Sequence, residues 1–207
     1  MNTASDVLDL GPVVPVVVLE DAEHAVPTAQ ALLRGGISTI EVTLRTPAAL
    51  SAIERIAAEV PEVVVGAGTI TERGQAQRAA KAGARYLVTP GFTETLLDEV
   101  DDTGLPSLPG VSTVSEALRL AERGARALKF FPAEPSGGVP ALKAFAGPLP
   151  ELRFCPTGGI TPDNASSYLA LPNVGCVGGS WLCPRDLLAA GEWEQVETMA
   201  RQAAQLG

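Results

Sequence analysis

The stretch Gly124-Ala125-Arg126-Ala127-Leu128-Lys129-Phe130-Phe131 places a lysine in the middle of an apolar run that has the character of a strand. An earlier stretch, Gly83-Ala84-Arg85-Tyr86-Leu87-Val88, aligns with its first six residues and has valine where the later copy has lysine. Burial strips an ammonium of hydration, which depresses its pKa and favours the nucleophilic neutral amine. Lys129 is therefore a candidate nucleophile. A lysine that reaches solvent from a strand end and a buried ion pair are the alternatives.

The alternation of a short apolar strand and a longer helix-like segment continues along the whole chain. Eight strands are predicted, at Val13–Leu19, Thr39–Leu44, Val63–Gly66, Tyr86–Thr89, Pro106–Leu108, Ala127–Phe131, Arg153–Cys155 and Val174–Val177. Nine helix-like segments are predicted, at Ala22–Arg34, Pro47–Val60, Thr71–Ala82, Thr93–Val100, Val114–Arg123, Pro140–Phe145, Asn164–Leu169, Pro184–Ala190 and Trp193–Leu206.

This pattern predicts an α/β protein, a single (β/α)8 TIM barrel over residues 1–207. Units of roughly 20 to 26 residues match a parallel barrel at the lower end of its usual size. An open doubly wound sheet is the alternative, but it usually needs fewer strands, and no Gly-x-Gly-x-x-Gly turn follows the first strand. No change in composition marks a linker or a second domain.

Composition and charge narrow the possible partners and compartments. A net charge of −9 disfavours nucleic acid and anionic membranes as partners, so an acidic ligand needs a local site. No apolar run is long enough to span a membrane, and Met1–Gly11 lacks the pattern of a secretory signal. Three cysteines without metal-ligand spacing and a single histidine, His24, argue against disulfides and a metal centre. We expect a cytoplasmic protein without a cofactor.

Polar residues alternate with apolar ones in Ile40-Glu41-Val42-Thr43-Leu44-Arg45. The two-residue period of a strand puts Glu41, Thr43 and Arg45 on one face, which in a closed barrel is the interior. The carboxylate and the guanidinium are therefore expected to share the interior with Lys129. A buried ion pair without catalytic function is the alternative.

Glycine pairs follow the last two predicted strands, in Thr157-Gly158-Gly159-Ile160 and Gly178-Gly179-Ser180-Trp181. These are the loops in which barrels often bind phosphate through backbone amides. Gly66-Ala67-Gly68-Thr69 ends the third predicted strand and offers amides and a hydroxyl to the same end of the barrel. Ordinary tight turns are the alternative in each case. Glu134 is interpreted as a loop cap and His24 as a surface or packing residue.

Five motifs together resemble those of the 2-keto-3-deoxy-6-phosphogluconate (KDPG) aldolase family. The motifs are Glu41-Val42-Thr43-Leu44-Arg45-Thr46, Val65-Gly66-Ala67-Gly68-Thr69, Leu108-Pro109-Gly110-Val111-Ser112-Thr113, Leu128-Lys129-Phe130-Phe131-Pro132-Ala133-Glu134 and Phe154-Cys155-Pro156-Thr157-Gly158-Gly159-Ile160. The resemblance spans nearly the whole chain. It implies a (β/α)8 barrel with an additional N-terminal helix, assembled as a homotrimer.

The resemblance also implies an activity and a role for each site residue. The activity is that of a class I lyase, which splits KDPG into pyruvate and glyceraldehyde 3-phosphate in the Entner-Doudoroff pathway. Lys129 forms the Schiff base and Glu41 transfers protons. Arg45 and Thr69 hold the pyruvyl carboxylate, and Thr157 orients the C4 hydroxyl. Backbone amides near four residues bind the phosphate, namely Gly158, Gly159, Gly179 and Ser180.

Other functions stay open on the sequence alone. The aldolase for the galactonate epimer resembles this chain too, although Thr157 and the loop Phe131–Glu134 favour the gluconate type. Activity on 4-hydroxy-2-oxoglutarate uses the same imine chemistry without a phosphate. A metal-dependent aldolase is disfavoured by the lone histidine. A noncatalytic barrel that binds phosphorylated metabolites, in which Lys129 and Glu41 neutralise each other, is the alternative from a different class.

Overall fold

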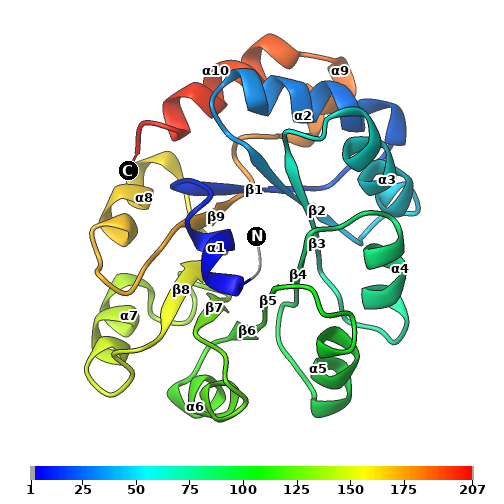
Figure 1. Ribbon diagram of the computed structural model, residues 1–207. Coiled ribbons are helices and arrows are strands. Elements are labelled where there is room, and N and C mark those ends of the chain that lie inside the picture. Colours follow the sequence, from blue (N-terminus) through cyan, green and yellow to red (C-terminus); the bar gives the residue numbers. More distant parts are fainter. Residues whose placement is uncertain (1–2, 207) are drawn as a thin grey trace.

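The computed structural model describes residues 3–206 and shows a parallel α/β fold with a curled sheet (Figure 1). The strands are β1 (Val13–Val17), β2 (Thr39–Thr43), β3 (Val64–Gly68), β4 (Tyr86–Val88), β5 (Ser107–Leu108), β6 (Gly110–Val111), β7 (Ala127–Phe130), β8 (Arg153–Pro156) and β9 (Val177–Gly179). They form a six-stranded ladder in the order β5-β4-β3-β2-β1-β9 and a three-stranded ladder in the order β6-β7-β8. Every pair within the two ladders is parallel.

Helices follow the strands and lie outside them, as Figure 1 shows. They are η1 (Ala22–His24), α2 (Ala25–Arg34), α3 (Ala49–Glu59), α4 (Gln75–Lys81), α5 (Glu94–Asp101), α6 (Val114–Glu122), α7 (Gly138–Ala146), α8 (Pro162–Leu169), α9 (Arg185–Ala190) and α10 (Trp193–Ala203). A short helix, α1 (Ala4–Leu8), precedes β1. None of the helices in residues 3–206 has the length and apolar character of a membrane span.

Proline separates two short strands where the sequence predicted one. β5 lies within the predicted strand Pro106–Leu108, and β6 is a further two-residue strand on the other side of Pro109 that was not predicted. Proline has no backbone N–H to donate to a ladder. The carbonyl of Pro109 still accepts a hydrogen bond from the backbone N–H of Lys129 at 3.0 Å, so β7 is hydrogen-bonded to the residue that separates β5 from β6.

The last predicted strand lies further along the chain than expected. β9 begins at Val177, whereas the prediction was Val174–Val177, because Val174 makes only an isolated bridge to Phe154. A second isolated bridge joins Thr157 to Gly178. These two parallel bridges connect the segments of β8 and β9 between the two ladders.

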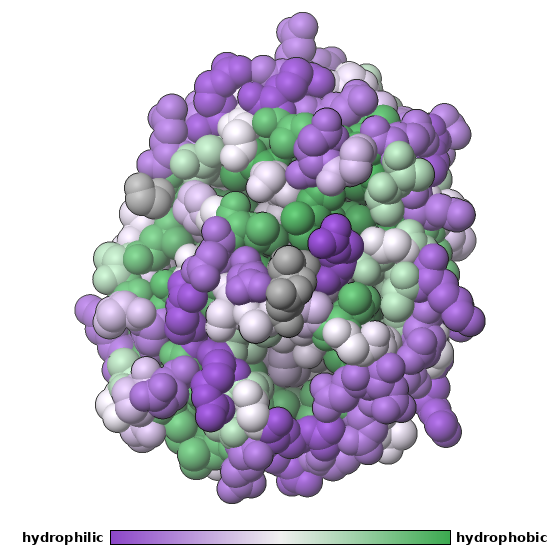
Figure 2. Space-filling model, viewed as in Figure 1, coloured by the Kyte–Doolittle hydropathy of each residue, from purple (hydrophilic) through white to green (hydrophobic). Residues whose placement is uncertain are grey.

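Alternating side chains form two apolar layers. Residues facing outward pack beneath the helices, as Ile40 and Val42 do on β2. Val7 and Leu8 of α1 are buried with Tyr86 in a second cluster inside the curl. In Figure 1, α1 lies in front of the centre of the curled sheet. Figure 2 shows the same face, where hydrophilic residues gather around the rim and apolar ones lie among them.

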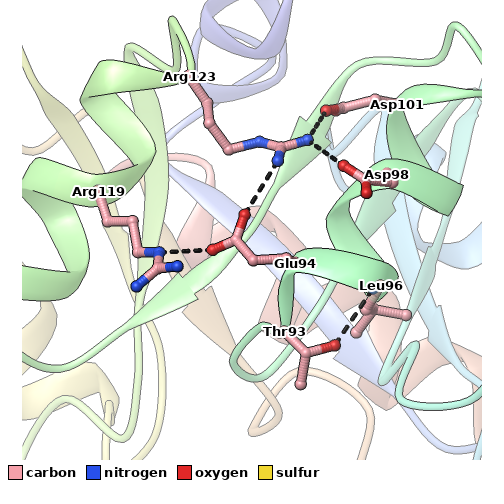
Figure 3. Close-up of polar contacts among 7 residues, drawn as sticks. All are labelled: Thr93, Glu94, Leu96, Asp98, Asp101, Arg119 and Arg123. Carbon is pink, nitrogen blue, oxygen red and sulfur yellow. Dashed lines mark hydrogen bonds and ion pairs between the residues drawn. The ribbon is translucent and has the colours of Figure 1, made fainter.

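Helices α5 and α6 are joined by a network of charged side chains, shown in Figure 3. The guanidinium of Arg123 pairs with Glu94, Asp98 and Asp101, and Arg119 also pairs with Glu94. These side chains are largely exposed, so such pairs contribute little each, and their value lies in the network that they form. The network links α5 to the C-terminal part of α6 and to Arg123, which follows it.

Candidate active site

Lys129 lies in the middle of β7 and its side chain points into the curl of the sheet. The residue is 5% exposed, and its strand neighbours Leu128 and Phe130 pack outward in the core beneath the helices. The sequence prediction that Lys129 is buried is therefore confirmed. Lys81 and Lys143, by contrast, are exposed on helices, as predicted.

Glu41 faces Lys129 from β2 across the interior. Its Oε1 lies 3.4 Å from the Nζ of Lys129, and the residue is 3% exposed. Two opposite charges from strands that lie far apart in the sequence therefore form a buried pair. Removing either charge from water is costly, and the attraction between the two groups offsets part of that cost, so neither group would be buried as favourably without the other. The pair brings a potential nucleophile and a potential proton carrier into direct contact.

Phe131 lies beside this pair. The sequence analysis did not assign Phe131 to the site. Its ring centroid lies 5.4 Å from the Nζ of Lys129, within the range of a cation–π contact. The ring also lies close to Gly158, where an added Cβ would approach two ring carbons at 3.3 Å. The available signal was its position two residues after Lys129 in the predicted strand Ala127–Phe131, although β7 itself ends at Phe130.

Arg45 lies at the mouth of the interior and not inside it. β2 ends at Thr43, so Arg45 falls in the following turn and is exposed, which corrects the prediction that it shares the interior with Lys129. Its Nε donates a hydrogen bond to Oγ1 of Thr69 at 3.0 Å. Thr69 has a left-handed φ of 58°, which is uncommon outside glycine and tends to occur at functional sites. The structure thus brings Arg45 and Thr69 together above the buried pair.

Thr157 and the two glycines after it form the loop at the end of β8. Thr157 is 7% exposed, and its hydroxyl lies 3.8 Å from Sγ of Cys155. Gly158 and Gly159 have φ values of 98° and 81°, which other residues adopt only with strain. The loop after β7 braces this turn, because the backbone N–H of Glu134 donates to the carbonyl of Gly158 at 3.1 Å.

A pocket of ≈ 130 Å³ opens between these loops. Its lining residues are Val16, Arg45, Phe131, Thr157, Gly158, Gly159, Ile160, Gly178 and Ser180. Gly179 is not among them, because the ring of Trp181 fills the space beside its Cα. Gly178 lines the pocket instead. The structure therefore brings Gly158, Gly159 and Ser180 together around one pocket, and Gly179 is not part of its lining.

Titratable groups surround the buried pair. A hydrogen bond from the thiol of Cys176 lowers the pKa of Cys155 despite burial, and the charge of Lys129 acts in the same direction. Cys155 is the register neighbour of Lys129 on β8. Burial, reinforced by the negative charge of Glu41, raises the pKa of Tyr86 well above its ordinary value. Tyr86 therefore remains a neutral phenol beneath the carboxylate, and its hydroxyl bonds to Thr39 at 3.1 Å.

Two weaker candidates contact neighbouring elements: His24 packs as expected, whereas Glu134, which was interpreted as a loop cap, contacts α8 and the loop after β8. The carboxylate of Glu134 accepts a hydrogen bond from the hydroxyl of Tyr168, and its side chain fills the space beside Gly159. His24 packs edge-on against Trp193, with ring centroids 5.6 Å apart. Within residues 3–206, no group of three or more His, Cys, Asp and Glu side chains is arranged to hold a metal ion.

Comparison with known proteins gives a consistent result along the chain. The family model for KDPG and KHG aldolase matches residues 4–199. The 2-dehydro-3-deoxy-phosphogluconate aldolase of Pseudoalteromonas atlantica is 51% identical over 201 residues, which cover 97% of this chain and 94% of that protein. The KHG/KDPG aldolase of Escherichia coli is 50% identical over 204 residues, with 99% and 96% covered.

A solved structure agrees in fold as well as sequence. KDPG aldolase from Legionella pneumophila, with pyruvate captured at low pH as a covalent carbinolamine intermediate, has a TM-score of 0.95 at 41% identity and covers 98% of both chains. Both the sequence match and the similarity in fold extend over nearly the whole chain. This chain therefore belongs to the KDPG and KHG aldolase family.

Proposed function

We propose that this protein is a class I aldolase that cleaves KDPG into pyruvate and glyceraldehyde 3-phosphate. The observation that carries the proposal is the buried 3.4 Å contact between Nζ of Lys129 and Oε1 of Glu41. This contact places an amine and a carboxylate where each can exchange protons with the other and with a bound substrate. Family membership supports the same chemistry, since a relative of this fold holds pyruvate as a covalent carbinolamine.

The reaction begins with attack of the Lys129 amine on the C2 ketone. Loss of water gives a protonated imine, which is an electron sink for the next step. Glu41 takes the proton of the C4 hydroxyl as the C3–C4 bond breaks, so glyceraldehyde 3-phosphate leaves and the bonding electrons form an enamine. Glu41 then returns a proton to C3, and water hydrolyses the imine to release pyruvate and the free amine.

Arg45 and Thr69 are proposed to bind the carboxylate of the pyruvyl group. Their contact at 3.0 Å holds the guanidinium at the open end of the interior, directly after β2 and β3. A guanidinium presents a rigid set of donors that matches a carboxylate. It also offsets the negative charge of the substrate in a protein of net charge −9.

The phosphate is proposed to bind the loops after β8 and β9. Support comes from the pocket of ≈ 130 Å³, which Gly158, Gly159 and Ser180 line. Glycine at these positions lets backbone amides approach an anion closely. Gly179 keeps its proposed role only through its backbone amide, because the ring of Trp181 covers its Cα.

Thr157 is proposed to orient the C4 hydroxyl and thereby to select the gluconate epimer. It lies between Cys155 and the phosphate loop, and its hydroxyl is buried in the interior. The epimers differ in how they present hydroxyl groups, so a fixed hydroxyl partner discriminates between them. The galactonate-derived substrate remains the alternative, and 4-hydroxy-2-oxoglutarate is the second candidate, favoured by the 50% identity to a relative named KHG/KDPG aldolase.

A substrate panel tests this function. Pyruvate release is measured with KDPG, its galactonate epimer and 4-hydroxy-2-oxoglutarate, for the wild type and for Lys129→Arg. We expect the fastest release from KDPG, slower release from the other two, and none from Lys129→Arg, because guanidinium does not supply a neutral amine. Pyruvate release from none of the three would favour a noncatalytic barrel that binds phosphorylated metabolites.

The wider organisation is also proposed. The two ladders are inferred to work as one eight-stranded barrel, supported by the continuation of the chain through Pro109 and by the bridges of Phe154 and Thr157. Residues 1–207 are proposed to form one domain, and the family resemblance suggests a homotrimer. The buried free cysteines Cys155 and Cys176 are consistent with a reducing, cytoplasmic environment.

A further inference from the structure

The inward positions at the end of β3 are both glycine. Gly66 and Gly68 alternate with Val65 and Ala67, which pack outward in the core beneath the helices. Neither glycine has a left-handed φ, so the backbone conformation accepts other residues at both positions. The space inside the curl must therefore explain why these positions lack a side chain.

Glu41 occupies the space above Gly68. A Cβ added at Gly68 would lie 2.0 Å from Oε1, 2.6 Å from Cδ and 2.7 Å from Cγ of Glu41, all far inside van der Waals contact. The ladder pairs Glu41 with Gly66 and not with Gly68. The side chain of Glu41 thus leans along the strand direction and lies over the next inward position.

The oxygen above Gly68 is the one that faces the nucleophile. Oε1 of Glu41 is the atom 3.4 Å from Nζ of Lys129, so the same atom makes both contacts. The adjacent space above Gly66 is already filled, because a Cβ there would lie 2.2 Å from the ring of Tyr86. Glu41 therefore has no equivalent place beside β3 if the space above Gly68 is lost.

We propose that Gly68 is a positioning residue, whose missing side chain sets the place of the Glu41 carboxylate against Lys129. The inference rests on the proposed function of Glu41 as the proton carrier. A methyl group at position 68 moves the carboxylate away from the reacting atoms and leaves Lys129 in place. Proton transfer is slowed by such a displacement, since about 1 Å of misplacement can cost about 10²-fold in rate.

The test combines two substitutions: Gly68→Ala adds a methyl group, and Glu41→Asp shortens the side chain that faces it. Gly68→Ala is expected to lower kcat for KDPG by about 10²-fold, with KM close to the wild-type value and with pyruvate still trapped on Lys129 by borohydride. Glu41→Asp alone should lower kcat, because the shorter side chain withdraws from Lys129. Added to Gly68→Ala, the same Glu41→Asp change should instead raise kcat, because the shorter side chain vacates the positions of Oε1 and Cδ, the two atoms that come closest to the new methyl group.

Two results would overturn the inference. One is a folded Gly68→Ala enzyme with wild-type kcat. The other is a Glu41→Asp change that lowers kcat by the same factor in the wild type and in the Gly68→Ala variant. If the Gly68→Ala single variant does not fold, the kcat of the Glu41→Asp single variant is compared with that of the Glu41→Asp/Gly68→Ala double variant. Equal kcat in that pair supports the inference, and a folding failure or a further large loss of kcat in the double variant contradicts it.

Gly91→Ala is the matched control. Gly91 has no left-handed φ, and a Cβ there would meet no atom within 4 Å. The kcat of the Gly91→Ala variant should therefore equal that of the wild type. Pyruvate release by the wild-type enzyme distinguishes a failure of this inference from a failure of the proposed function. No pyruvate release by wild-type enzyme counts against the function itself, whereas an active wild type with an equally active Gly68→Ala variant counts against the positioning role alone.

Discussion

The residues that matter most are charged groups held out of water. Lys129 is apparent from the sequence because a cation interrupts an apolar strand, and Glu41 because polar residues alternate along β2. Arg45 follows the same alternation but lies beyond the end of the strand, where the period of two no longer applies. Phe131 was not assigned to the site, and Gly68 was noted only for its backbone amide, because apolar or absent side chains carry no chemical signal of their own.

Glu41→Gln tests the proton-transfer role at this scale. The variant keeps the size of the side chain and removes its basicity, so we expect turnover to fall by roughly 10² to 10⁴. Borohydride should still trap pyruvate on Lys129, since imine formation depends first on the amine. Turnover is measured by pyruvate release from KDPG, with circular dichroism to establish that the variant is folded.

The exposed Glu62 provides the matched control, because Glu62→Gln makes the same chemical change outside the site. It should turn over KDPG at the wild-type rate. Near-normal turnover of folded Glu41→Gln would show that Glu41 has only a structural function.

At the scale of elements, helices were predicted to within a few residues and strand ends less well. Side-chain periodicity and caps such as Thr113 mark helices locally. Strand ends depend on partners that lie far away in the sequence. Gly68 belongs to β3, which was predicted to end at Gly66, because it pairs with Thr43 of the neighbouring strand β2.

The start of α6 gives a pH-dependent prediction. Burial by itself would raise the pKa of Glu116, but hydrogen bonds from Ser112 and Thr113 lower it below its ordinary value of 4.5. A carboxylate with a lowered pKa stabilises the fold above its unfolded-state pKa, and this contribution disappears as the pH falls through its folded-state pKa. Glu116→Gln should therefore cost about 1 kcal/mol of unfolding free energy at neutral pH and progressively less below about pH 4.5.

Urea unfolding at a series of pH values measures this cost. Glu122→Gln is the control, because the exposed Glu122 ends the same helix, where a negative charge opposes the helix dipole. That variant should be as stable as the wild type or slightly more stable. A cost for Glu116→Gln that stays constant with pH would contradict the assigned capping role.

For the molecule as a whole, the repeat of strand and helix was sufficient to predict a parallel α/β fold. The sequence did not show that the strands form two ladders joined by bridges, because that depends on Pro109 and on the register between β8 and β9. The repeat of strand and helix does not predict the quaternary structure, because only the family resemblance suggests a homotrimer.

We predict a homotrimer with self-contained sites. Light scattering should give about three times the 21.3 kDa mass of one chain. The Lys129–Glu41 pair and the Arg45–Thr69 hydrogen bond each form within a single chain, so mixing inactive Lys129→Arg and Glu41→Gln subunits should not restore activity. A mass near that of one chain at micromolar concentration would contradict the trimer, and restored activity would mean that subunits share sites.

The most direct test of the proposed mechanism is reductive trapping of the intact protein with pyruvate and borohydride. A Schiff base at the buried amine predicts one pyruvate-derived adduct per chain, loss of activity, and a label that peptide mass mapping assigns to Lys129. Lys129→Arg should take up no label. A label confined to the exposed Lys81 or Lys143, or full activity after treatment, would contradict the central claim that Lys129 is the nucleophile.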